Sequence, residues 1–131
     1  MENKAIVELK EISFTYGTEP VLEDINLILR EKDFLGIIGP NGGGKTTLLK
    51  LILGLLEPNK GSIKVFGEPP EKGRKLIGYL PQHFSFDYDF PMSVMEVILM
   101  GRLGKKGIGR KYSEIDIKVC LESLKKVGME A

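Results

Sequence analysis

Residues 39–50 read GPNGGGKTTLLK, and this stretch decides how the rest of the chain is interpreted. Three consecutive glycines, Gly42 to Gly44, stand directly before Lys45 and two threonines. Glycine lets backbone N–H groups turn toward a ligand without a Cβ atom in the way. Bare backbone beside one fixed positive charge therefore predicts a site for an anion.

The stretch satisfies the pattern G-x-x-x-x-G-K-[ST] of a phosphate-binding loop. In such a loop, Lys45 reaches the terminal phosphates and the Thr46 hydroxyl binds Mg²⁺. The alternative is a glycine-rich turn with a merely solvated Lys45, but the full pattern seldom arises by chance. We therefore predict a nucleoside triphosphate as ligand. The predicted contacts are Gly39, Pro40, Asn41, Gly42, Gly43, Gly44, Lys45, Thr46 and Thr47.

The segments on both sides of the loop provide the expected context. FLGIIG, residues 34–39, is a short continuous apolar run and predicts a central strand buried on both faces. Residues 45–56 are helix formers with apolar residues at helical spacing, and Pro58 closes the segment. A strand, a loop and a helix are predicted in that order.

Four further segments have strand character. ISFTY (12–16) and DINLIL (24–29) alternate apolar and polar residues, and the turn-forming residues 17–20 lie between them. GSIKVFG (61–67) alternates in the same way, and KLIGYLPQ (75–82) is a short apolar run that ends near a proline. All four are predicted strands.

The last third of the chain predicts two helices. Ser93 with Glu96 has capping-box spacing, and a helix should run from there to about Gly101. Residues 101–111 are rich in glycine and lysine and predict a loop. Ser113 with Asp116 repeats the capping pattern and predicts a helix that stops at glycine 128. Its expected apolar face consists of Ile117, Cys120, Leu121 and Leu124.

Composition limits the other functions that the chain could have. Its 131 residues carry 19 Lys and Arg against 18 Asp and Glu, so we expect no nucleic-acid partner. The single cysteine, Cys120, excludes an internal disulfide and is expected to be a small apolar helix residue. No N-terminal signal peptide is apparent, and the apolar residues 48–56 are too few to span a bilayer. A soluble intracellular chain is predicted.

Taken along its length, the sequence resembles the ATP-binding cassette (ABC) ATPases that drive membrane transporters. FTYG (14–17) and VLEDINL (21–27) are similar to the adenine-binding segment of that family, which implies Tyr16 stacked on the base and Val21 at its edge. EPNKGSIKVFG and IGYLPQ also match family segments. The second implies that Gln82 senses Mg²⁺ and the γ-phosphate, beside Lys45 as a catalytic residue.

One segment resembles a narrower group within the family. Residues 87–102, DYDFPMSVMEVILMGR, are similar to cassettes of zinc and manganese importers. Aromatic and apolar residues crowd a predicted loop there, as in a partner-binding surface. They are Phe84, Phe86, Tyr88, Phe90 and Met92. The resemblance implies that Phe84–Met100 contacts a transmembrane permease subunit, although these residues could instead cover the domain's own core.

The family pattern implies an α/β fold. It consists of a P-loop NTPase-like core with an antiparallel β subdomain at the N-terminus and the start of a helical subdomain. The β subdomain and the phosphate-binding loop would occupy about residues 1–82. The family's glutamine loop, or Q-loop, and the start of the helical subdomain would occupy about residues 83–131. The resemblance further implies ATP and Mg²⁺ as cofactors, a second ATP-binding subunit as homodimer partner, and a place on the cytoplasmic face of the membrane.

Part of the family pattern is not found in this sequence. The LSGGQ-type signature, the apolar strand that ends in catalytic acids and the switch histidine are missing, since His83 follows Gln82 directly and Asp87 and Asp89 do not end an apolar strand. We expect these 131 residues alone not to hydrolyse ATP. Three interpretations remain open: the front half of a transport ATPase, for metal ions or another substrate; a short nucleotide-binding module without turnover; and, least favoured, a small-molecule kinase.

Overall fold

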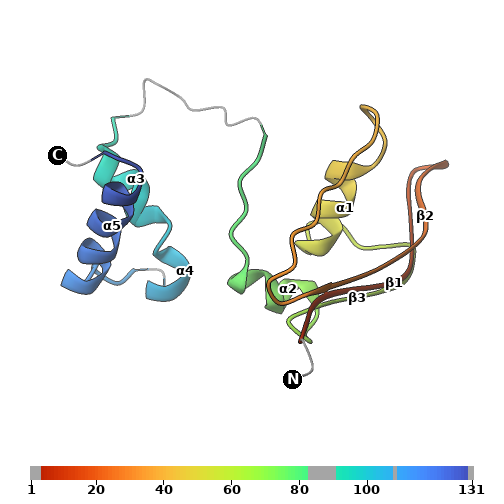
Figure 1. Cartoon of the computed structure of the whole chain (residues 1–131), viewed down its shortest axis with the longest axis horizontal. Coiled ribbons are helices and arrows are strands. Elements are labelled where there is room, and N and C mark those ends of the chain that lie inside the picture. The colour runs from red at the N-terminus through yellow and green to blue at the C-terminus, as the bar shows by residue number, and fades with distance from the viewer. Residues whose placement is uncertain (1–3, 83–90, 108, 130–131) are drawn as a thin grey trace. The chain divides into compact units, whose positions relative to one another are not determined.

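The structure, a computed structural model, describes residues 4–82, 91–107 and 109–129. It divides the chain into two compact units, Met1–Leu80 and Pro81–Ala131 (Figure 1). The first unit holds a three-stranded sheet and the glycine-rich loop, and the second unit is helical.

The sheet is antiparallel, with strand order β2-β1-β3. Its strands are β1 (Ala5–Tyr16), β2 (Glu19–Arg30) and β3 (Lys60–Val65), which confirms the strands predicted at 12–16, 24–29 and 61–67. In the register, Leu9 pairs with Leu27 of β2 and with Ile63 of β3. The two long strands are joined by the predicted turn, narrowed to residues 17 and 18.

Irregularities in β1 and β2 keep the apolar side chains on one face although their spacing changes. Leu9 and Ile12 are both fully buried but are three residues apart, which a regular strand would place on opposite faces. The register shifts between them, where Glu11 has a φ of 51°. The Asn26 side chain accepts a hydrogen bond from the Glu11 N–H at 2.9 Å and holds this bulge.

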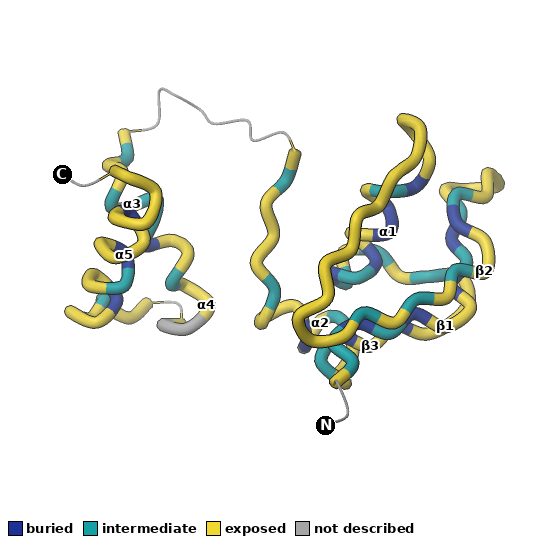
Figure 2. The backbone as a smooth tube through the Cα atoms, viewed as in Figure 1, coloured by how far each residue is buried: buried dark blue, intermediate teal, exposed yellow. Residues whose placement is uncertain are grey.

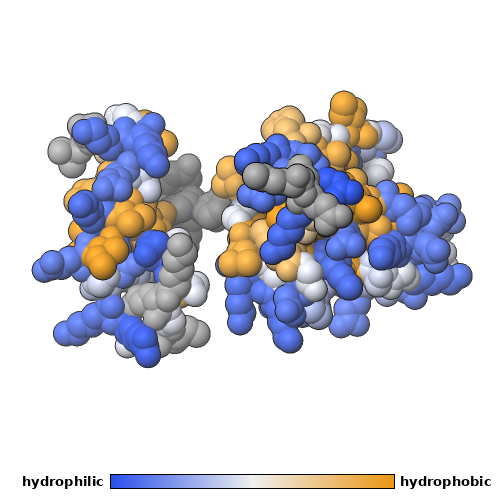
Figure 3. Space-filling model, turned by 60° about the horizontal axis from the view of Figure 1, so that its bottom comes forward, coloured by the Kyte–Doolittle hydropathy of each residue, from blue (hydrophilic) through white to orange (hydrophobic). Residues whose placement is uncertain are grey.

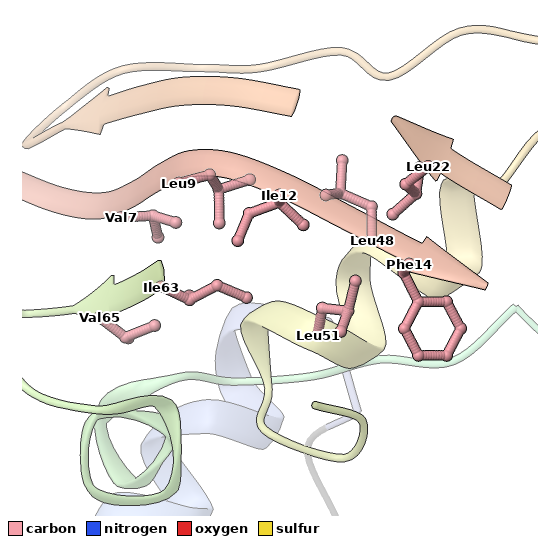
Figure 4. Packing of buried hydrophobic residues seen from close by; sticks show 9 residues of the cluster. All are labelled: Val7, Leu9, Ile12, Phe14, Leu22, Leu48, Leu51, Ile63 and Val65. Carbon is pink, nitrogen blue, oxygen red and sulfur yellow. The ribbon is translucent and has the colours of Figure 1, made fainter. Parts of the chain in front are cut away.

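Helix α1 (Lys45–Ile52) packs against the sheet. Leu48 and Leu51 point from the helix toward apolar side chains of the strands (Figure 4). The cluster comprises Val7, Leu9, Ile12, Phe14, Leu22, Leu48, Leu51, Ile63 and Val65. Burial of these side chains, at ~25 cal/mol per Å² of apolar surface, is what anchors the helix and therefore the loop that precedes it.

The helix ends earlier than the sequence predicts. Gly54 adopts a left-handed φ of 62°, and its N–H donates to the Leu51 carbonyl at 3.0 Å. The Leu55 N–H donates to the Lys50 carbonyl at 2.9 Å, which completes a Schellman motif. The prediction that the helix extends to residue 56 and ends at Pro58 is therefore wrong, because Gly54 stops the helix first.

Two predicted strands are not formed in the described residues. Residues 34–39 form no helix or strand and are exposed, so the prediction of a central strand buried on both faces is wrong for this structure. The prediction of a strand at residues 75–82 is also wrong. Helix α2 (Pro70–Gly73) leads into the short helix η1 (Arg74–Leu76), and an irregular segment follows. A central strand needs a hydrogen-bonded neighbour on each edge, and neither segment pairs with the described sheet β2-β1-β3.

The second unit contains α3 (Val94–Met100), α4 (Leu103–Lys106) and α5 (Glu114–Lys126). Helices α3 and α5 begin and end where the sequence predicts, but the predicted loop at 101–111 contains the short helix α4. Cys120 and Leu124 are buried, which confirms Cys120 as a small apolar helix residue, whereas Ile117 and Leu121 are exposed. The apolar face of α5 is therefore narrower than predicted.

An ion pair joins the helices of this unit. Arg102 Nε lies 2.8 Å from Asp116 Oδ1, and both side chains are largely covered. Hydrogen bonds from Ser113 and the ion pair with Arg102 lower the pKa of Asp116 from 3.8 to about 2. The second unit therefore holds an ionised carboxylate at neutral pH.

Apolar side chains also reach the surface of both units (Figure 3). Within the described ranges, no helix is long and apolar enough to cross a membrane.

Candidate phosphate-binding site

The loop between residues 39 and 45 turns tightly before α1. The Gly43 N–H donates to the Pro40 carbonyl at 3.1 Å, and the Gly44 N–H donates to the Gly42 carbonyl at 2.9 Å. Gly42 and Gly44 have φ values of 80° and 77°, a region that residues with a Cβ atom seldom adopt. The glycines are therefore required by the backbone path of the loop.

Gly44 also brings the loop against strand β2. A Cβ atom at this position would lie 2.8 Å from Leu22 Cδ2 and 3.0 Å from the Val21 carbonyl oxygen. This approach places the predicted base-edge residue Val21 next to the start of α1. Leu22 is not among the predicted site residues, since its apolar side chain within VLEDINL gives no sign of that contact.

Lys45 is bound to the carbonyl groups of its own loop. Its Nζ atom donates to the Gly39 carbonyl at 2.8 Å and to the Pro40 carbonyl at 2.6 Å. The side chain is half-buried, so the ammonium group is folded back over the loop and does not extend into solvent. An ammonium group has three N–H donors, which leaves one for a further acceptor.

The N-terminus of α1 lacks the side-chain cap that usually closes a helix start. Gly44 is the N-cap residue and has no side chain, and the first turn contains no acidic residue. The first N–H groups of a helix have no partner within the helix, and they carry its partial positive charge. Backbone donors beside an ammonium group are the arrangement that a phosphate group requires.

The two threonines after Lys45 differ in exposure. Thr46 is exposed at the N-terminus of the helix, whereas Thr47 is only 7% exposed. The exposed hydroxyl of Thr46 fits the predicted Mg²⁺ ligand, since a hydroxyl oxygen is a ligand that this cation accepts. No cluster of three or more His, Cys, Asp or Glu side chains suited to a metal occurs among the described residues.

Tyr16 ends strand β1 at the same hairpin that carries Val21. Its ring makes an edge-to-face contact with Phe14, with ring centroids 4.9 Å apart and an interplanar angle of 87°. Phe14 is buried, but Tyr16 remains 50% exposed. The buried ring supports the exposed one, which is therefore available for stacking.

The remaining predicted residues, Gln82 and Phe84–Met100, belong to the second unit. Gln82 is exposed and belongs to the second unit, so its role as a sensor stays a prediction. The aromatic residues between 83 and 90 lie outside the described residues. Met92 is half-buried, and Val94 and Met100 in the same segment are 56% and 52% exposed.

A glycine-shaped loop, a lysine folded over it and an uncapped helix start together fit the predicted phosphate-binding loop, in a chain of mixed α/β fold. A family model described as ABC transporter matches residues 22–130. The chain therefore belongs to the ABC transporter family, and the resemblance stated from its sequence is confirmed.

Relatives of known function support this membership. MntB, the manganese transport system ATP-binding protein of Bacillus subtilis, is 45% identical over 123 residues, which are 94% of this chain and 49% of that protein. TroB, the zinc transport system ATP-binding protein of Treponema pallidum, is 39% identical over 125 residues, which are 95% of this chain and 47% of that protein. The chain thus spans about half the length of the curated relatives it matches.

Solved structures show the same fold. One is cbiO1 from Clostridium perfringens, part of the ABC transporter complex cbiONQ; its TM-score is 0.73 at 26% identity, over 98% of this chain and 52% of that one. Another is an ATP-binding subunit of an ABC transporter, with a TM-score of 0.76 at 27% identity, over 95% of this chain and 51% of that one. The predicted α/β fold class, with its antiparallel N-terminal sheet, is confirmed.

Proposed function

We propose that this chain binds ATP with Mg²⁺ as the nucleotide-binding part of an ABC transporter ATPase. The observation that supports this most is the uncapped N-terminus of α1 beside the folded-back Lys45. Membership of the ABC transporter family supports the same ligand. ATP hydrolysis, and its coupling to transport, belong to the proposal for the whole transporter subunit.

Each residue of the site has a distinct role in the proposal. Backbone N–H groups at the start of α1 bind the phosphate oxygens, and Lys45 binds the terminal phosphates through its ammonium group. The Thr46 hydroxyl holds Mg²⁺, which neutralises phosphate charge when bound. Tyr16 stacks on the base, and Val21 contacts its edge. Gln82 is proposed to sense Mg²⁺ and the terminal phosphate.

We further propose a metal ion of the zinc or manganese type as the transported substrate. The support is the similarity to the manganese and zinc transport proteins MntB and TroB, together with the segment 87–102. ATP-binding subunits do not contact the transported ion, so no residue of this chain is assigned to it. Metal uptake by cells in which the gene has been deleted would test this substrate, and unchanged zinc and manganese uptake would contradict it.

The segment Phe84–Met100 is proposed to contact a transmembrane permease subunit. Within its described part, Val94 and Met100 expose apolar side chains at opposite ends of α3. A homodimeric second ATP-binding subunit and a place at the cytoplasmic face of the membrane complete the proposal. Val94→Asp should reduce co-purification with the permease without unfolding α3, and undiminished co-purification would contradict this surface.

The nucleotide site is tested by Lys45→Ala with Lys50→Ala as matched control. Both lysines belong to α1, but Lys50 is exposed in its last turn. Charge-assisted hydrogen bonds contribute ~1.5–3 kcal/mol each, so Lys45→Ala should weaken ATP–Mg²⁺ binding about tenfold to a hundredfold. Lys50→Ala should leave the affinity unchanged. Isothermal titration calorimetry on the 131-residue chain measures both.

Equal affinities of the two variants would contradict the phosphate role of Lys45. Circular dichroism of both variants checks that α1 still forms, because Lys45 also holds the loop through two carbonyl groups. Phosphate release in the same samples tests the expectation that these residues alone do not hydrolyse ATP. Release above that of Lys45→Ala would contradict it.

A further inference from the structure

Tyr16, the residue proposed to stack on the base, lies at the end of strand β1, where only one neighbouring strand remains. Most of β1 is buried or half-buried, but Tyr16 is exposed (Figure 2). On one edge of β1, Tyr16 pairs with Glu19 of β2. On the other edge, the register with β3 runs only from Val7 to Ser13. Among the described residues, Thr15 and Tyr16 therefore have no strand beside them on the β3 edge.

The side chain of Asn59 takes the place of the missing strand. Its Oδ1 atom accepts a hydrogen bond from the Thr15 N–H at 2.7 Å and another from the Thr15 hydroxyl at 3.3 Å. The Asn59 N–H donates to the Ser13 carbonyl at 2.9 Å. Asn59 thus binds two alternate residues of β1 on one edge, as a paired strand would. The preceding residue, Pro58, has no N–H with which to extend the ladder itself.

These hydrogen bonds fix the backbone directly before Tyr16. A peptide group is planar, so an anchored Thr15 N–H also fixes the orientation of the atoms around it. Phe14 and Tyr16 lie on either side of Thr15, and side chains two residues apart in a strand share a face. Their rings are in edge-to-face contact, with centroids 4.9 Å apart. Tyr16 is therefore held by a ring contact on the face of the sheet and, through Thr15, by Asn59 at its edge.

We infer that Asn59 is a positioning residue for the binding of the base by Tyr16. This role rests on the proposed function, in which Tyr16 holds the base. Asn59 lies in EPNKGSIKVFG, a segment to which that function assigns no residue. Because Asn59 acts on the base through Thr15 and Tyr16, its loss should weaken binding of the base but not of the phosphates. A residue that only stabilised the sheet would affect both alike.

Asn59→Ala is tested with two ligands that share a phosphate chain: ATP, which carries a base, and inorganic triphosphate, which does not. Isothermal titration calorimetry with Mg²⁺ measures both affinities. We expect ATP affinity to fall about threefold to tenfold, the size of one net hydrogen bond, while triphosphate affinity stays the same. Partial unfolding would lower both affinities by one factor and leave their ratio unchanged. Asn59→Asp keeps an acceptor oxygen and should retain the ratio of the unmodified chain.

Asn26→Ala is the matched control. The Asn26 Oδ1 atom likewise accepts a hydrogen bond from a backbone N–H of β1, that of Glu11, at 2.9 Å. Asn26 is also exposed, but Glu11 lies well before Tyr16 in the strand. Asn26→Ala removes the same kind of hydrogen bond away from the tyrosine, so it should leave the ratio of ATP affinity to triphosphate affinity unchanged.

A double substitution tests whether Asn59 acts through Tyr16. Tyr16→Ala removes the stacking ring and should lower ATP affinity about fivefold to a hundredfold. Adding Asn59→Ala to Tyr16→Ala should then lower ATP affinity no further. An unchanged affinity ratio in Asn59→Ala, or an additive loss in the double variant, would overturn the inference alone. Absence of ATP binding by the unmodified chain would overturn the proposed function as well.

Discussion

Among the described residues, the three longest helices begin in two different ways. Helices α3 and α5 start with complete capping boxes: Ser93 with Glu96, and Ser113 with Asp116. In each box the serine N–H donates to the carboxylate, and the serine side chain accepts from the backbone N–H three residues later. Helix α1 starts at Gly44 with no side-chain cap and no acidic residue in its first turn.

The difference separates helix starts that stabilise the fold from one that is available for a ligand. A side-chain cap is worth roughly 0.5–2 kcal/mol to a helix. Helix α1 forgoes that contribution and is held by Leu48 and Leu51, which are buried in the core of the first unit. Its first N–H groups therefore remain available to an anion.

The largest expected effect is on stability and should follow from Gly44→Ala at the N-terminus of α1. The substitution strains a backbone with φ of 77° and places a Cβ atom 2.8 Å from Leu22 Cδ2. Backbone strain and overpacking cost about 1–3 kcal/mol each, so we expect a loss of about 3 kcal/mol in the free energy of unfolding. Urea denaturation followed by circular dichroism measures it. An unchanged midpoint would show that the loop does not depend on this glycine.

The next effect should come from giving α1 the acidic residue that its first turn lacks. Thr46→Asp places a carboxylate beside the exposed N–H groups, where it favours the helix but repels phosphate. We expect ATP–Mg²⁺ affinity to fall at least tenfold while the melting temperature stays the same or rises. Thr46→Ser is the control and should retain binding. Retained ATP binding by the aspartate variant would mean that the helix start is not the anion site.

A smaller effect concerns the capped start of α5 and depends on pH. The pKa of Asp116 is lowered from 3.8 to about 2, so its stabilising contribution is complete above about pH 4 and is lost as the pH falls through 2. We expect the native amide resonances of α5 in NMR spectra to weaken over this range. In Asp116→Asn they should be weaker already at pH 5 and depend less on pH. Identical pH profiles would contradict the role of this carboxylate.

Local chemistry made most of this structure predictable from the sequence. The glycines and Lys45 predicted the loop, and the two capping boxes predicted the starts of α3 and α5. The alternation of apolar and polar residues predicted strands β1, β2 and β3. Each of these features depends on residues close together in sequence. The end of α1 at Gly54 also depends on nearby residues, but Pro58 was predicted to end the helix instead.

Features that depend on distant residues were not predictable in the same way. Residues 34–39 have the composition of a central strand. That composition does not show whether neighbouring strands are present to pair with the segment. The contact of Leu22 with the loop likewise arises from packing between β2 and α1. In α5, the spacing placed Ile117 and Leu121 on an apolar face, but only Cys120 and Leu124 are buried. Burial depends on how much of a face the neighbouring helix covers.

The close approach of Gly44 to Leu22 has a mechanical consequence. The loop touches the hairpin strand that carries Val21, and the same hairpin carries Tyr16. This contact blocks a shift of the loop backbone toward β2, so the loop and strand β2 cannot move independently in that direction. The spacing between Tyr16, the proposed base-binding residue, and the glycine-rich loop is therefore set by packing inside the first unit.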